Sequence, residues 1–285
     1  MAVNANCYFS NAIVGVPQVA AGQVNVYKED TTARFAIGTK FERQDGAVFR
    51  YAHFGATVDS AGLLCSVDVS ESSTTLKPGV VVASSSTYQM PEETTGVYPN
   101  MLGSKYMLIT LASVQTDTYA GGYITISSGN SASSHTYRIK GNTATGNPDS
   151  GNTRIELYEK LQAGLNSSQG FTITGSRYAN LEANLPATGT DLAAGVTMIS
   201  ITTANDYGWV QTQGICGVLA GETTILAGRM VSASTEVAGA VDLYNINVQS
   251  LTSTAYAVAP VNPIVGIACQ NSTAGTFIPI VLMLE

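Results

Sequence analysis

The residues best suited to chemistry are scarce in this sequence. Only two histidines occur, His53 and His135, and each sits in an alternating strand-like run with apolar neighbours, where a structural role is the ordinary one. The sequence has no G-x-S-x-G, H-E-x-x-H or P-loop pattern, which would supply a nucleophile, a zinc ligand pair or a phosphate cradle. We therefore predict that the chain is not an enzyme and uses no cofactor.

Oxygen-rich segments could in principle perform acid–base chemistry or bind a metal. The pairs Glu92–Glu93 and Asp68/Glu71 lie in polar stretches, where carboxylates are typically solvated. Oxygen ligands alternate over residues 147–152, as a calcium loop would require, but this segment departs from the EF-hand pattern and lacks its closing glutamate. We expect no metal site.

The four cysteines, Cys7, Cys65, Cys216 and Cys269, stand far apart without any C-x-x-C spacing. This spacing argues against a metal or redox motif and favours buried free thiols. Cys216 and Cys269 each follow a Gly-Ile start in a short apolar segment, so a disulfide between neighbouring strands stays open.

Composition narrows the class of protein. The chain is 45% hydrophobic but only 12% charged, with a net charge of −7, whereas an average soluble domain is about 25% charged. Its 13 Lys and Arg residues form no cluster, which argues against direct nucleic-acid binding. We expect no signal peptide and no membrane span, hence synthesis in a host cytoplasm. Such a composition is typical of extracellular adhesins and of virion proteins, because much of their surface is buried against neighbours.

Short β-branched runs closed by glycine turns indicate an all-β chain: short-strand sandwich or barrel modules with an extended N-terminal arm and very little helix. Asp45-Gly46 lies between two alternating runs and predicts a hairpin, with Phe49 and Tyr51 facing the core. The one helix candidate is a turn or two over Glu159–Leu165, because Leu157, Leu161 and Leu165 keep an i, i+4 spacing.

We predict four segments along the chain. Residues 1–34 form an arm whose scattered apolar residues need another surface to lie on, and residues 35–104 form a first β module. Residues 105–190 are an inserted β block, and residues 191–285 form a C-terminal β module.

The C-terminal module carries a family resemblance. The run from Tyr207 to Gly214 reads YGWVQTQG, and it is followed by AGRMV at Ala227–Val231, VGIA at Val265–Ala268 and a final apolar strand. A pattern DGxxFxYA…AGxL begins at Asp45. Together these resemble the head decoration, or cement, proteins of tailed bacteriophages.

The resemblance implies a structural protein on the outer surface of the capsid, often a homotrimer, that reinforces contacts between major capsid proteins. Tyr207 and Trp209 would then be core residues of the closing module. The expected contacts to the capsid or to other subunits are Tyr8, Phe9, Val14 and Val16 in the arm and Phe277, Ile280, Leu282 and Leu284 in the final strand.

The alternative is a receptor-binding or tail-fibre module, in which the polar loops Ser84–Asn100 and Gly141–Asn152 recognise a host surface glycan. Copy number in the virion distinguishes the two readings. A carbohydrate-active enzyme would need a close pair of catalytic carboxylates, and the sequence offers no preferred pair. A major capsid protein would need a long helix and a charged extended loop.

Overall fold

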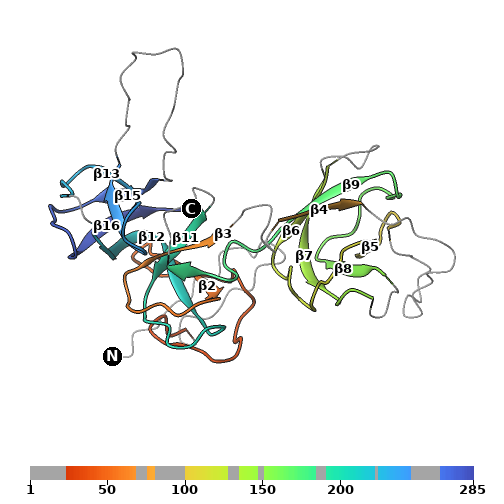
Figure 1. Ribbon diagram of the computed structural model, residues 1–285, viewed down its shortest axis with the longest axis horizontal. Coiled ribbons are helices and arrows are strands. Elements are labelled where there is room, and N and C mark those ends of the chain that lie inside the picture. Colours follow the sequence, from red (N-terminus) through yellow and green to blue (C-terminus); the bar gives the residue numbers. More distant parts are fainter. Residues whose placement is uncertain are drawn as a thin grey trace, which may run out of the picture. The chain divides into compact units, whose positions relative to one another are not determined.

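The computed structural model describes residues 24–68, 76–80, 100–127, 135–146, 151–183, 191–221, 224–244 and 264–285. All regular elements in these ranges are β-strands, and no helix occurs among them (Figure 1), which confirms the predicted all-β class. Within the same ranges, no helix is long and apolar enough to cross a membrane. Tyr8, Phe9, Val14 and Val16 of the predicted arm lie outside the described residues.

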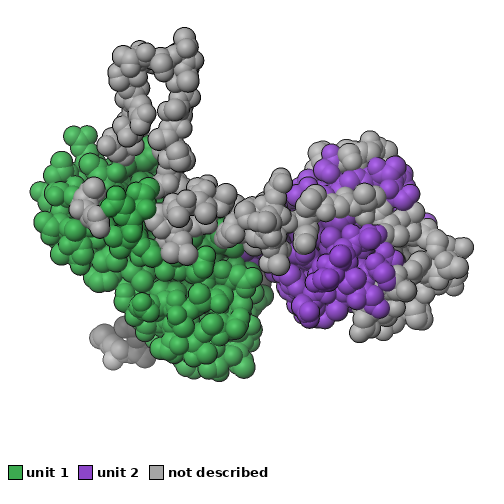
Figure 2. All heavy atoms as spheres, in the orientation of Figure 1, with its two compact units in different colours: residues 1–68, 177–285 green, residues 69–176 purple. Residues whose placement is uncertain are grey.

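The chain divides into two compact units (Figure 2). Unit 1 comprises residues 1–68 and 177–285, and unit 2 comprises residues 69–176, so unit 2 is inserted within unit 1. Our predicted inserted block spans 105–190, whereas the second unit begins at residue 69 because strand β4 (Leu76–Val80) pairs with β9 (Gly170–Thr174) of that unit.

Unit 1 contains one antiparallel sheet in the order β10-β3-β11-β12-β16-β15-β13-β14, with β2 on the other edge of β12 and β1 beside β2. Its strands are β1 (Lys40–Glu42), β2 (Val48–His53), β3 (Leu64–Asp68), β10 (Glu182–Ala183), β11 (Asp191–Thr197), β12 (Tyr207–Leu219), β13 (Met230–Ala233), β14 (Val241–Leu243), β15 (Ile264–Ala268) and β16 (Phe277–Met283). The sheet curls at one end, because Ala220, just after β12, forms a bridge with Val241 of β14. We call the curled group of β12 to β16 the C-terminal barrel.

The predicted hairpin is confirmed. β1 and β2 pair from Glu42 opposite Val48, and Gly46 adopts a φ of 83° in the turn between them. That left-handed conformation explains the glycine, since an L side chain is strained there. Phe49 and Tyr51 are fully buried, so the prediction that they face the core is also confirmed.

An aromatic cluster covers one face of the paired strands β2 and β12. Trp209 is buried at its centre, with its ring centroid 5.2 Å from that of Tyr51 and 5.5 Å from that of Phe35. Tyr207 is half-buried at the edge and stacks on Tyr51 at 5.9 Å. The YGWV run therefore packs against the DGxxFxYA hairpin, which brings the two halves of the sequence pattern together.

Part of the predicted arm is anchored to its own chain. Val26 is buried against the aromatic cluster, and Asp30 exchanges backbone hydrogen bonds of 2.9 and 2.8 Å with Tyr207. The Glu29 carboxylate accepts hydrogen bonds from the backbone N–H groups of Thr202 and Thr203, at 2.7 and 3.3 Å. Residues 24–30 consequently belong to unit 1 rather than to a free arm.

Unit 2 is a six-stranded sheet in the order β4-β9-β6-β7-β8-β5 that wraps around its own apolar core. Its remaining strands are β5 (Tyr106–Ile109), β6 (Tyr123–Ile126), β7 (Thr136–Asn142) and β8 (Thr153–Leu157). The helix predicted over Glu159–Leu165 is wrong. Leu161 and Leu165 are buried in this core, and their backbone N–H groups bond to the carbonyls of Ser104 and Asn100, so the leucine spacing serves an irregular segment packed on the sheet.

Candidate interaction face on the C-terminal barrel

The two faces of β16 differ sharply in burial. Ile280, Leu282 and Leu284 are buried in the core of the barrel, with exposed fractions of 8% or less. We expected these three residues to contact a partner, but the barrel closes around them within one chain. Phe277, by contrast, points outward and is 51% exposed, and Val281 and Met283 share its face.

Strand register extends this outward face across the sheet. Val281 lies opposite Ile215 on β12 and opposite Ile267 on β15, and Ile267 lies opposite Met230 on β13. Ile215 is the most exposed large apolar residue of the described chain, at 68%. We define the outer apolar face by the side chains that share this outward orientation: Ile215, Met230, Ile267, Phe277, Val281 and Met283.

The central residues of this face are uncharged. The outward positions on β12 after Gly214, on β15 and on β16 hold apolar residues and glycine or proline, and none of these described positions is charged. The whole chain nevertheless carries a net charge of −7. Contiguous exposed apolar surface without charge is the kind of surface that partners commonly cover.

Two glycines shape the face. A Cβ on Gly62, whose φ is +81°, would lie 2.8 Å from the Phe277 ring, so this glycine gives Phe277 its place at the end of β16. A Cβ on Gly266 would lie 2.1 Å from the Val281 carbonyl oxygen, so only glycine allows β15 to approach β16 this closely. Both glycines stand in the motifs AGxL and VGIA that carry the family resemblance.

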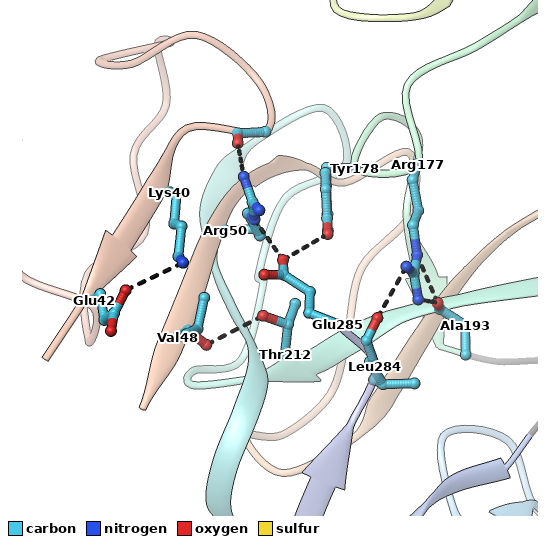
Figure 3. A network of polar contacts seen from close by, with 11 residues as sticks. Lys40, Glu42, Val48, Arg50, Arg177, Tyr178, Ala193, Thr212, Leu284 and Glu285 are labelled. Carbon is cyan, nitrogen blue, oxygen red and sulfur yellow. Dashed lines mark hydrogen bonds and ion pairs between the residues drawn. The ribbon is translucent and has the colours of Figure 1, made fainter. Parts of the chain in front are cut away.

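A polar network fixes the residues that follow β16 (Figure 3). The Arg50 Nε donates to Glu285 Oε1 at 2.5 Å, Arg50 Nη1 donates to the Gly38 carbonyl at 3.0 Å, and the Tyr178 hydroxyl donates to Glu285 Oε1 at 3.2 Å. Burial alone would raise the pKa of the Glu285 carboxyl. The hydrogen bond and charge of Arg50, with the hydrogen bond of Tyr178 and the charge of Lys40, together outweigh burial and hold that pKa below its ordinary value. Burial raises the pKa of Tyr178 to about 12.

Arg177, the first residue of unit 1 after the inserted unit 2, also contacts the end of the chain. Its Nη1 donates to the Leu284 carbonyl at 3.0 Å, and its Nε donates to the Ala193 carbonyl at 2.9 Å (Figure 3). The network therefore connects β2, β11 and the end of β16, and it holds the strand that carries Phe277, Val281 and Met283. Sequence reasoning missed it, because Arg50 and Glu285 are 235 positions apart and belong to no local motif.

The described histidine and cysteine residues make packing and backbone contacts. His53 Nδ1 accepts the backbone N–H of Asn180 at 3.4 Å, and burial lowers the pKa of His53. Cys216 is buried and Cys269 is exposed, and both are free thiols, because β16 lies between β12 and β15 and separates them. Burial raises the pKa of Cys216 to about 12. In the described ranges, no group of three or more His, Cys, Asp or Glu side chains could hold a metal ion.

No family model matches the chain, and no curated protein and no solved structure matches it either. What the outer apolar face offers a partner is the burial of apolar surface.

Proposed function

We propose that the chain is a virion structural protein that binds the outer surface of a tailed-phage capsid and stabilises contacts between major capsid proteins. The observation that carries this proposal is the outer apolar face. Covering its exposed side chains with a partner would remove apolar surface from water and so lower the free energy of the complex. The sequence motifs that resemble decoration proteins lie in or against the strands that build this face, which supports the same function.

The proposed mechanism is additional buried area. A subunit that spans neighbouring capsomers adds apolar contact that must be broken before they separate, at roughly 25 cal/mol per Å² of apolar surface. Assembly as a homotrimer is part of the proposal. Three linked faces would bind the lattice together, and the second and third contacts would form at high effective concentration. Light scattering on the purified protein measures its mass and tests the trimer directly.

The primary test is binding of the purified chain to expanded and unexpanded heads, imaged by electron cryomicroscopy. We expect regular extra density on the outer lattice of expanded heads. Ile215→Asp should abolish this density, because it places a charge at the most exposed position of the outer apolar face. Leu102→Asp is the matched control, since Leu102 is 67% exposed but lies in unit 2.

Three results would contradict the proposal: bare heads, density confined to the tail, or full binding of the Ile215→Asp variant. Density only at the tail would instead favour receptor binding. A deletion that tests the arm should span residues 2–23, because Val26, Glu29 and Asp30 are part of unit 1. Loss of head binding in that variant is the expected result if the arm contributes contacts.

A further inference from the structure

The insertion of unit 2 needs an explanation of its own. Its core is formed by residues of unit 2 alone, and the two described cores of unit 1 contain none of them. The described cores of the two units are therefore separate, and what unit 2 adds to the chain is its own surface.

The outer side of this sheet carries a continuous row of tyrosines and cations. Tyr123 on β6 lies opposite Arg138 on β7, and the Arg138 guanidinium lies 5.0 Å from the ring centre of Tyr158. On the next strands the Arg154 guanidinium lies 4.1 Å from the ring centre of Tyr106. We call this row the Tyr/Arg strip: Tyr106, Tyr123, Arg138, Lys140, Arg154 and Tyr158.

The strip is locally cationic on an acidic chain. Half of the six Lys and Arg residues between positions 69 and 176 lie in it. Glu156 offsets part of this charge, at 3.4 Å from Arg154 and 3.5 Å from Lys140, and Glu159 accepts the backbone N–H of Arg138. The Lys140 side chain is 61% exposed, so its ion pair is weak and exchanges readily for another anion.

Aromatic and hydroxyl groups complete the surface. Tyr123 is 48% exposed and lies on strand β6, so its ring stands on the outer side of the sheet. Beside it, the hydroxyls of Thr125 and Thr136 share a hydrogen bond of 2.9 Å across the strands and remain exposed. The strip thus combines an exposed aromatic ring, hydroxyl groups and the exposed ammonium group of Lys140.

We propose that the Tyr/Arg strip binds an acidic polysaccharide. A pyranose ring presents C–H groups that pack against the electron-rich face of Tyr123. A carboxylate or sulfate on the same chain would reach Lys140 and Arg138, and the threonine hydroxyls would bond ring hydroxyls. This inference does not depend on head binding, because the strip and the outer apolar face lie in different units.

Other partners fit the strip less well. Single-stranded nucleic acid stacks successive bases on several aromatic rings. In the strip, the Arg138 and Arg154 guanidinium groups already lie over the rings of Tyr158 and Tyr106, which leaves Tyr123 as the ring on which a ligand would stack. An apolar protein surface would need aliphatic side chains, and the six residues of the strip are tyrosine, arginine and lysine.

The test is affinity electrophoresis of the full chain in gels that contain polygalacturonate, dextran sulfate or neutral dextran. We expect retardation by one or both acidic polymers and none by dextran, and the two acidic gels distinguish carboxylate from sulfate. Tyr123→Ala and Lys140→Gln should each weaken retardation by about tenfold, the size typical of a well-placed contact.

Unit 1 offers matched controls. Tyr27 is a 60% exposed tyrosine, and Lys28 is a 54% exposed lysine with one ion pair at 3.5 Å, so Tyr27→Ala and Lys28→Gln repeat the same chemical changes outside the strip. These variants should be retarded like the parent chain. The proposal is overturned if neither acidic polymer retards the chain, if dextran retards it equally, if the controls lose as much as the strip variants, or if Tyr123→Ala changes nothing.

Discussion

The outer apolar face of unit 1 and the Tyr/Arg strip of unit 2 lie on two sheets whose buried side chains are alike. Their outward side chains differ in polarity. Both sheets bury isoleucine, leucine and valine or phenylalanine on the inside. Outside, unit 1 exposes Ile215, Phe277 and Met283, whereas unit 2 exposes Tyr123 and Lys140. The inward residues build the core of each unit, while the outward residues of the same strands set the surface that each unit offers to a partner.

The prediction with the largest expected effect is that the two units unfold independently. Trp209→Ala removes the centre of the aromatic cluster and should destabilise unit 1 by about 3–5 kcal/mol, while Ile124→Ala in the core of unit 2 should cost about 2–5 kcal/mol. Differential scanning calorimetry should show two transitions, each shifted by one variant only. A common shift of both transitions would show that the units unfold together.

The second prediction concerns the two sides of β16. Ile280→Ala empties part of the barrel core and should cost about 2–5 kcal/mol, whereas its neighbour Val281→Ala should change stability by less than about 1 kcal/mol. Urea unfolding followed by tryptophan fluorescence measures both, because the one tryptophan of the chain reports on unit 1. Equal losses would contradict the assignment of inside and outside.

Which side of β16 is buried could not be predicted from the sequence. The Asp45-Gly46 hairpin and its buried Phe49 were predictable, because turn chemistry and alternation are local signals. The segment Phe277–Leu284 is apolar on both faces, so alternation alone could not tell Ile280 from Val281. Their difference comes from the closure of the barrel through Ala220 and Val241, which is a long-range event.

The smallest expected effect concerns the polar network that fixes the end of β16. Glu285→Gln removes the charge that pairs with Arg50 and should destabilise unit 1 by about 1 kcal/mol at neutral pH. Glu42→Gln is the matched control, since Glu42 is an exposed ion-pair partner of Lys40 and should matter by less than about 0.5 kcal/mol.

The effect of Glu285 depends on pH in a defined direction. Its pKa is lower in the folded protein than in the unfolded chain, so the folded state favours the charged form. The stabilisation is therefore complete above the unfolded pKa of about 4.3 and is lost as the pH falls through the folded-state pKa. The parent chain should exceed Glu285→Gln in stability at neutral pH and lose this advantage in acid, as urea unfolding followed by Trp209 fluorescence would measure. A difference that stays constant with pH would mean that Glu285 acts through shape rather than charge, and Arg50 would then not be what holds the strand beneath the outer apolar face.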